Sequence, residues 1–298
     1  MMKTLKYMVV WFMLSVVTFR SSAQPAVLSI NKPVAGPEVK RFQTTSNLEL
    51  EYAEQGDPEA PVLIMLHGFT DSRISFSRIL PMLPSSMHVV AISMRGHGNS
   101  GKTGDDFSVK SMSDDIISLA KARQWKQVSL LGHSMGGVIA MQTALDHPEL
   151  VSRLILIGTD PFYGDNAGMP EFLQAVEELG DPVPRQFSLD FQLSTIVQPI
   201  EESFLDELVA ESEKLSAKNW RLCLRSLLKT DLRSRLPELN MPVTVFWGEK
   251  DAVCDITGQQ EMWQGIKKVN LIKFAGIGHA LHWEAPVEFV EDLKNLIR

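Results

Sequence analysis

The pentapeptide GHSMG at residues 132–136 is the stretch whose residue types and spacing most directly indicate chemistry. A short apolar run, Gln127–Leu131, precedes it, and a stretch rich in alanine and methionine, Gly137–His147, follows with the composition of a buried helix. A Gly-x-Ser-x-Gly sequence between a strand and a helix forms a sharp turn, the nucleophile elbow, which exposes the serine hydroxyl. The flanking glycines remove side chains that would clash in such a turn. Ser134 is therefore the predicted nucleophile.

A serine nucleophile needs a general base, and the sequence offers a candidate near its C-terminal end. Of the seven histidines, only His279 and His282 follow the last predicted strand, Val269–Phe274. His279 lies in a loop with two glycines, which allow the ring to reach over the strand ends, and it is the predicted base. His282 is expected to support this site or to contact a lid. His133, beside the nucleophile, is expected to face away along the turn and to have a structural role.

The acid that orients the base should follow the preceding strand, in the chain order serine, acid, histidine. Here the strand pattern Val243–Trp247 leads into the sequence GEKD at residues 248–251, and Asp251 is the predicted acid. Glu249 is the alternative within this turn and is expected to be solvated. Asp160, which follows another predicted strand, remains a rival for the same role.

An acyl-transfer site also needs donors for the oxyanion, and two backbone N–H groups are expected to supply them. The nucleophile elbow provides the N–H group of Met135. The second donor should come from the loop after an earlier strand, and Val62–Leu66 runs into the sequence HGFT at residues 67–70. The N–H group of Phe69 is the predicted donor, and His67 is expected to hold this loop rather than to act as a base.

A sheet must position these residues, and the short apolar runs along the chain are its predicted strands. The first two strand patterns alternate apolar with polar residues, which predicts an antiparallel pair at a sheet edge. The others are continuous apolar runs, typical of parallel strands buried on both faces. The predicted strands are Val39–Thr44, Leu48–Ala53, Val62–Leu66, Val89–Met94, Gln127–Leu131, Leu154–Ile157, Val243–Trp247 and Val269–Phe274.

Helical patterns lie between most of these runs, so the predicted fold is α/β, a mostly parallel doubly wound sheet with ligands at the carboxyl ends of its strands. The patterns are marked by Ile74–Leu83, Val109–Leu119, the segment after Ser134, and Phe289–Leu296.

One stretch, residues 160–239, breaks the alternation because it contains only helical patterns. It is predicted to be a helical lid inserted before the last two strands, with residues 38–159 and 240–298 forming the core. Most apolar residues of this insert are expected to form its own core. Candidates to line a substrate pocket within it are Phe162, Tyr163, Phe191 and Leu193.

The N-terminus is predicted to be separate from the fold. Lys3 and Lys6 precede an apolar run at residues 7–19, and the small residues at 21–23 suit a signal peptidase, so residues 1–23 read as a signal peptide cleaved after Ala23. The alternative is an uncleaved membrane anchor, although the run is short for a membrane span. Residues 24–37 are proline-containing and predicted to be irregular. The expected location is secreted or periplasmic.

Composition limits the possible partners and cofactors. The 298 residues carry a net charge of −7 with no basic run, which argues against nucleic-acid binding and against tight binding to anionic lipid once the signal peptide is removed. The two cysteines, Cys223 and Cys254, leave a single disulfide open as a possibility. No Cys/His cluster has zinc spacing, so no metal is expected. The oligomeric state is left open.

From about Val39 to Arg298 the chain resembles the lidded α/β-hydrolase superfamily. Five motifs carry the resemblance in order. They are HGF at 67–69, MRGHGNS at 94–100, GHSMGG at 132–137, GEKD at 248–251, and GH at 278–279 followed by EAP at 284–286. The resemblance implies hydrolysis without a cofactor through an acyl-enzyme, and a structural role for the loop at 95–100. Some lidded members place the acid at the position of Asp160.

Departures from the family patterns narrow the reaction class. Epoxide hydrolases and haloalkane dehalogenases of this fold carry aspartate at the elbow, where this chain has Ser134. Carbon–carbon bond hydrolases often have asparagine before the nucleophile, where this chain has His133. The sequence thus favours a serine hydrolase acting on a small or medium carboxylic ester or lactone. Carbon–carbon hydrolysis, amidase or perhydrolase chemistry on the same triad, detoxification of a secreted lactone or amide, and a non-catalytic receptor of the same fold remain alternatives.

Overall fold

The computed structural model describes residues 36–102 and 104–297. The predicted signal peptide, residues 1–23, and all but the last two residues of the predicted irregular segment 24–37 lie outside this range. Among the described residues, no helix has the length and apolar character needed to span a bilayer.

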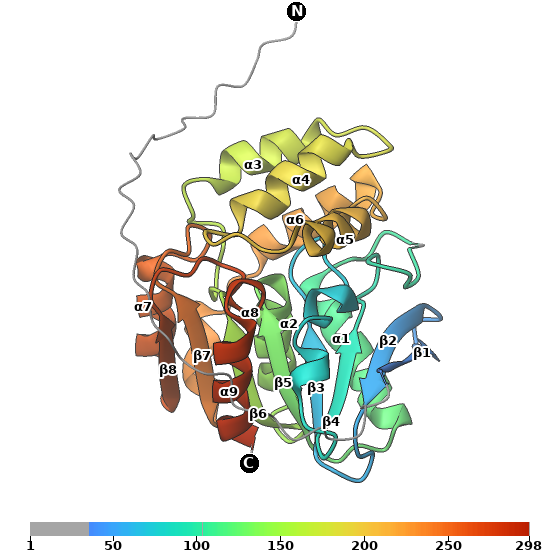
Figure 1. Ribbon diagram of the computed structural model, residues 1–298, viewed down its shortest axis with the longest axis vertical. Helices are drawn as coiled ribbons and strands as arrows, with labels where there is room; N and C mark the ends of the chain where they lie inside the picture. The colour runs from blue at the N-terminus through green and yellow to red at the C-terminus, as the bar shows by residue number, and fades with distance from the viewer. Residues whose placement is uncertain (1–35, 103, 298) are drawn as a thin grey trace, which may run out of the picture. The chain divides into compact units, whose positions relative to one another are not determined.

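The central element is an eight-stranded sheet in the order β1-β2-β4-β3-β5-β6-β7-β8 (Figure 1). β1 and β2 run antiparallel at one edge, as their alternating patterns predicted, and β3 to β8 are parallel to one another. The inner strands are buried on both faces, which explains their continuous apolar runs. The strands are β1 Glu38–Gln43, β2 Glu49–Gln55, β3 Val62–Leu66, β4 His88–Ile92, β5 Val128–His133, β6 Val151–Ile157, β7 Val243–Gly248 and β8 Val269–Phe274.

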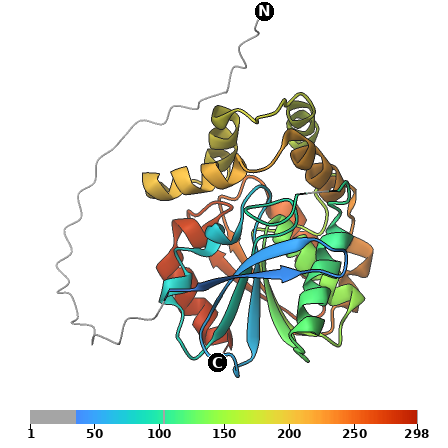
Figure 2. The same ribbon diagram turned by 90° about the vertical axis from the view of Figure 1, so that its right-hand side faces the viewer.

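Helices cover both faces of the sheet (Figures 1 and 2). One apolar core joins the sheet to α1 (Val109–Ala122), α2 (Met135–Asp146) and α7 (Ile256–Gly265). A second core, on the opposite face, joins it to α9 (Pro286–Ile297) and to the short turns before β4. α8 (Leu281–Glu284) connects the last loop to α9.

The segment marked by Ile74–Leu83 differs from the expected single helix. It forms two short 3-10 helices, η1 (Arg73–Phe76) and η2 (Leu80–Met82). The reason is Pro81, whose missing N–H group and ring prevent an α-helix from continuing through this position.

Between β6 and β7 lie four helices and a final 3-10 helix, and the structure describes every residue of this insert. Figures 1 and 2 show these helices above the carboxyl ends of the strands. α5 packs against η1 and α6 against α1, so the insert rests directly on the core. Its elements are α3 Met169–Glu177, α4 Arg185–Ser194, α5 Glu202–Ser212, α6 Ala217–Lys229 and η3 Arg233–Glu238.

The strand register brings the predicted site residues to one edge of the sheet. Leu66 pairs with Gly132, and His133 pairs with Ile157, so the loops after β3, β5 and β6 begin side by side. Gly248 pairs with Phe274, which places the loops after β7 and β8 together in the same way. All five loops therefore meet beneath the insert.

Candidate active site

Ser134 occupies the turn between β5 and α2 in a strained backbone conformation, with φ 52° and ψ −120°. A non-glycine residue rarely adopts such a conformation, and where one persists the surrounding structure must hold it. Here a Cβ atom on Gly136 would overlap the carbonyl oxygen of Leu66, so the glycine allows α2 to pass close to β3. The Ser134 side chain is thereby presented at the N-terminus of α2, where the helix dipole favours negative charge.

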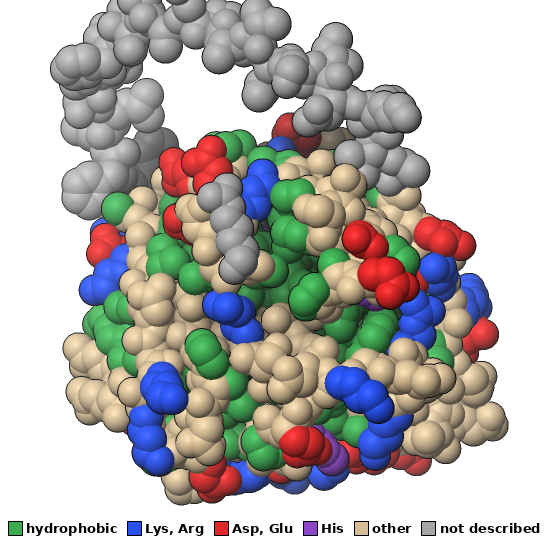
Figure 3. Space-filling view, turned by 90° about the horizontal axis from the view of Figure 1, so that it is seen from below, with side chains coloured by type: hydrophobic (Ala, Val, Ile, Leu, Met, Phe, Trp, Pro, Cys, Tyr) green, Lys and Arg blue, Asp and Glu red, His purple; other side chains and the backbone are tan. Residues whose placement is uncertain are grey.

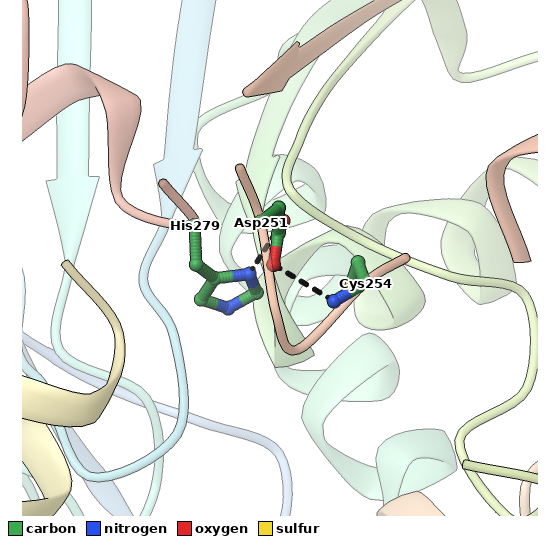
Figure 4. Close-up of side chains that lie close together, drawn as sticks. All are labelled: Asp251, Cys254 and His279. Carbon is green, nitrogen blue, oxygen red and sulfur yellow. Dashed lines mark hydrogen bonds and ion pairs between the residues drawn. The ribbon is translucent and has the colours of Figure 1, made fainter. Parts of the chain in front are cut away.

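Asp251 and His279 are hydrogen-bonded to each other, as Figure 4 shows. His279 Nδ1 lies 2.9 Å from Asp251 Oδ2. A carboxylate only accepts, so Nδ1 donates, and in the neutral ring Nε2 is left free to accept a proton. The other oxygen, Asp251 Oδ1, accepts from the N–H groups of Val253 and Cys254, each at 2.8 Å. Both carboxylate oxygens are therefore occupied, and the orientation of His279 is fixed.

The surroundings of His279 favour its charged form. The ring is 3% exposed, and burial alone lowers its pKa, but the charge of Asp251 and the hydrogen bond to it outweigh burial, so the pKa is raised above 6.5. Asp160 and Asp71 raise the pKa further. This arrangement stabilises the imidazolium ion that a general base becomes after taking a proton.

The hydroxyl of Ser134 contacts a residue that the motifs did not assign to the catalytic group. Within residues 36–102 and 104–297, the one hydrogen-bond partner of Ser134 Oγ is the hydroxyl of Tyr163, at 3.4 Å. A direct hydrogen bond from Ser134 to His279 is absent from this described part of the chain. Catalytic hydrogen bonds are often long in ligand-free enzymes and shorten only in the complex with substrate. This contact links the loop after β5 to the loop after β6. The sequence does not indicate it, apart from the position of Tyr163 at the start of the insert.

The two predicted oxyanion donors lie at the expected loops. The Phe69 N–H group donates to no acceptor in the described residues, and Met135 is the first residue of α2, whose N–H group has no partner within the helix. His67 holds the first loop, since its Nε2 accepts from the Met94 N–H group at 2.9 Å and its Nδ1 bonds the Gly68 carbonyl at 2.8 Å. Both free N–H groups are thus available to a developing negative charge.

Helix α4 of the insert contacts the site on two sides. Gln192 Nε2 donates to Asp71 Oδ1 at 3.0 Å and to the hydroxyl of Ser212 at 2.9 Å, which ties the loop after β3 to α4 and α5. The carbonyl of Thr195, at the end of α4, accepts from the His279 N–H group at 3.1 Å. The loop of the predicted oxyanion donor and the loop of the predicted base therefore both depend on this helix.

Asp71 is a buried residue of this site that sequence reasoning missed. Burial raises its pKa to about 7, and the hydrogen bonds from Gln192 and Ser75 only partly offset that effect.

His133, a neighbour of Asp71, does not face away from the site as expected, because its ring lies 4.9 Å from that of His279 and 4.6 Å from that of His282. His282 bonds the Ser75 hydroxyl at 3.1 Å. For Asp71, the one signal in the sequence that could have indicated a position in the site is its closeness to Phe69.

Neither of the two alternative acids is hydrogen-bonded to His279 in the described residues. Glu249 is exposed, and Asp160 accepts from Gln259 Nε2 at 2.8 Å and is buried against α7 at Gly258. Burial, together with the charge of Asp251, raises the pKa of Asp160 to about 7. Asp160 is therefore close to the predicted acid but is not hydrogen-bonded to His279.

The two cysteines are both buried and unpaired, which settles the question of a disulfide. Cys254 lies beside the site, and its Sγ, with ligand atoms of Asp251 and His279, forms a group within 4.8 Å that could hold a metal ion (Figure 4). The Asp251 and His279 atoms that face each other in this group are already hydrogen-bonded together. The Cys254 thiol in turn lies 3.2 Å from the hydroxyl of Tyr163.

Comparisons with known proteins agree with this architecture. Residues 61–286 match the family model described as the alpha/beta hydrolase fold. An uncharacterized hydrolase of Bacillus subtilis, YugF, is 23% identical over 270 residues, covering 87% of this chain and 98% of its own.

Two solved structures show the same fold. An esterase of Exiguobacterium antarcticum has a TM-score of 0.77 at 22% identity, covering 86% of this chain and 98% of its own. The enol-lactonase of Burkholderia xenovorans LB400 has a TM-score of 0.71 at 17% identity, covering 87% and 99%. With its mostly parallel eight-stranded sheet and its family match over most of the sequence, this chain belongs to the α/β-hydrolase family.

Proposed function

We propose that the protein is a serine hydrolase that cleaves a small or medium carboxylic ester or lactone through an acyl-enzyme. The observation that carries this proposal is the His279–Asp251 hydrogen bond of 2.9 Å at the same sheet edge as the strained Ser134. A nucleophile, a base with a free Nε2 and an acid that fixes its tautomer are the parts that acyl transfer requires.

The mechanism follows from these positions. His279 Nε2 takes the proton of Ser134 as Oγ attacks the carbonyl carbon of the substrate, and it then gives that proton to the leaving alcohol. Asp251 stabilises the imidazolium ion between the two transfers. The N–H groups of Phe69 and Met135 bind the oxyanion, and each such donor contributes on the order of 10²–10³ in rate. Water then attacks the acyl-enzyme with His279 again as the base.

Aromatic residues around the first oxyanion donor favour an apolar substrate. The ring of Phe69 packs edge-on against Phe172, Phe191 and Trp220 of the insert, with centroid distances of 5.1 to 6.3 Å. Ser134 is 7% exposed and is therefore largely shielded from solvent. Exclusion of water strengthens the electrostatic contacts at the oxyanion and suits a carbonyl substrate with an apolar acyl group.

The names of similar proteins support the two substrate classes. The Exiguobacterium protein is called an esterase and the Burkholderia protein an enol-lactonase. Among the curated relatives, a monoacylglycerol lipase of Xenopus laevis is 23% identical over 274 residues. Esters and lactones share the acyl–oxygen bond that the proposed triad would break.

The test is turnover of an ester and lactone panel of graded acyl length by the wild-type protein and by Ser134→Ala and His279→Ala. Each substitution is expected to abolish turnover nearly completely, since triad members act as a unit. A fluorophosphonate probe should label the wild type and not Ser134→Ala. Near-full activity in either variant would refute the assignment, and an unlabelled wild type would instead support a receptor with an inert serine.

A further inference from the structure

Tyr163 is held rigidly between the nucleophile and the loop of the predicted acid. It follows β6, at the beginning of the insert, and is 2% exposed. The segment around it is fixed on both sides, because the carbonyl of Pro161 accepts from the Leu232 N–H group at 3.0 Å and the carbonyl of Tyr163 accepts from the Asn166 N–H group at 3.2 Å. These bonds hold the backbone around Tyr163, and burial restricts the phenol itself.

The direction of its hydrogen bonds follows from the available protons. Among the described residues, two side-chain atoms lie within hydrogen-bond distance of the Tyr163 hydroxyl, Ser134 Oγ at 3.4 Å and Cys254 Sγ at 3.2 Å. Sulfur is a weak acceptor, and the Cys254 thiol is itself a donor, with the Tyr163 hydroxyl and the Gly158 carbonyl, at 3.3 Å, as its two acceptors. If the Ser134 proton is directed to His279, the phenol proton of Tyr163 has Ser134 Oγ as its acceptor.

We propose that Tyr163 is a further catalytic residue, whose hydroxyl donates to Ser134 Oγ and stabilises that oxygen as it leaves the acyl group. The inference rests on the proposed function, because it requires an acyl-enzyme on Ser134. It adds a third hydrogen-bond donor to the site, aimed at the serine oxygen rather than at the carbonyl oxygen of the substrate.

The step concerned is deacylation. His279 takes a proton from water as the water oxygen attacks the acyl carbon, and a tetrahedral intermediate forms. The bond from this carbon to Ser134 Oγ then breaks, its electron pair stays on Oγ, and the proton on His279 Nε2 passes to Oγ. The carboxylic acid and the free serine result. Tyr163 keeps its proton throughout and supplies only a hydrogen bond to the departing oxygen.

The hydrogen bond should act more strongly on deacylation than on acylation. In the acyl-enzyme, Oγ is an ester oxygen, a poor acceptor because its lone pair is delocalised into the carbonyl group. Negative charge develops on Oγ as it leaves, so the hydrogen bond strengthens toward the transition state, which is the condition for catalysis. In the free enzyme the serine hydroxyl already accepts this bond, and removing it costs acylation less.

Burial keeps Tyr163 in the state that this role requires. The buried phenol has a pKa raised well above 10 by its removal from water, and the nearby Cys254 and Asp160 raise it further. The residue therefore remains a donor over the working pH range of a histidine base.

The test compares Tyr163→Phe with the wild type on p-nitrophenyl butyrate. Because kcat/KM depends on acylation alone and kcat also on deacylation, we expect kcat to fall about tenfold and kcat/KM to change less than about threefold. A burst of p-nitrophenol should appear or grow, and intact-protein mass spectrometry after acid quench should show the butyryl-enzyme accumulating. Its decay after removal of substrate should be slowed by the same factor as kcat.

Tyr52→Phe is the matched control, since Tyr52 is also buried but lies on β2, away from the site. It should leave kcat, kcat/KM and the acyl-enzyme fraction unchanged. Cys254→Ala removes the thiol that contacts Tyr163 and should slow decay of the butyryl-enzyme in the same direction by a smaller factor, which provides a second measurement if Tyr163→Phe folds poorly.

The outcomes separate this inference from the proposed function. Wild-type decay of the butyryl-enzyme in Tyr163→Phe, or an equal fall in kcat and kcat/KM without accumulation, would overturn the role of Tyr163 alone. Turnover of p-nitrophenyl butyrate by Ser134→Ala at the wild-type rate, or formation of a butyryl-enzyme on that variant, would overturn the proposed function itself.

Discussion

Two of the buried carboxyl groups that raise the pKa of His279, those of Asp251 and Asp160, differ in the atoms that they contact. Asp251 accepts hydrogen bonds from the ring of His279 and from two backbone N–H groups. Asp160 instead accepts from Gln259, and its carboxyl group packs against α7. The sequence placed both residues after strand ends and ranked Asp251 first from chain order. It could not show their hydrogen bonds, because these depend on how the loops after β6 and β7 turn.

This difference predicts opposite results for two matched substitutions. Asp251→Asn should lower kcat on the order of 10³-fold or more, because the amide favours the wrong tautomer of His279. Asp160→Asn should change kcat less than about threefold, because an asparagine oxygen can still accept from Gln259. Steady-state turnover of one ester decides between them, and the reverse ranking would make Asp160 the acid.

The raised pKa of His279 predicts the pH dependence of the reaction. A general base must be neutral, and a raised pKa keeps the ring charged to higher pH, so kcat/KM should rise with pH through an inflection above 6.5. Asp71→Asn removes one of the charges that raise this pKa and should move the inflection downward. A pH–rate profile of both proteins is the measurement. An inflection at or below 6.5 in the wild type would contradict the electrostatic account.

At the scale of elements, the nucleophile elbow depends on the closeness of α2 and β3. Both α2 and β3 were predictable, because the apolar run of β3 and the motif between β5 and α2 are local signals.

The sequence did not predict two other elements, the pair of 3-10 helices and α7. The 3-10 turns replace a helix because of Pro81, and α7 was missed because only Gln259 and Met262 are buried on it, which leaves no apolar stripe to detect.

Substitution of an elbow glycine should therefore disrupt the junction of these elements. A Cβ atom on Gly136 would overlap the backbone of β3 at Leu66, which cannot move without disturbing the sheet. Gly136→Ala is expected to lower the free energy of unfolding by about 3 kcal/mol or to prevent folding. Gly180→Ala, where a Cβ atom meets nothing within 4 Å, should change it by less than about 1 kcal/mol. Denaturant unfolding followed by circular dichroism measures both, and equal effects would contradict this account.

At the scale of the whole molecule, the sequence predicted the sheet and the helical insert but not how the insert is attached. Buried strands and amphipathic helices leave local patterns, whereas the bond from Gln192 to Asp71 joins residues 121 positions apart. The net charge of −7 likewise does not tell how the charged side chains are distributed over the surface. On the face turned away from the insert, acidic and basic side chains are interspersed rather than gathered (Figure 3).

The two free thiols report on the integrity of the whole fold. Burial raises the pKa of Cys223 to about 12 and that of Cys254 well above 9, so neither should react with a thiol reagent in the native protein. In guanidinium chloride without reductant, two thiols per chain should react, since the sequence has two cysteines and they are unpaired. Titration with a chromogenic disulfide reagent measures both values. Fewer than two thiols in denaturant would indicate a disulfide after all.

The two attachments of α4 have a consequence for how the enzyme admits its substrate. Gln192 is bonded to the loop that carries Phe69, and Thr195 is bonded to the backbone of His279. A displacement of this helix during substrate entry would stretch or break both bonds, so it would disturb the loop of the predicted oxyanion donor and the loop of the predicted base together.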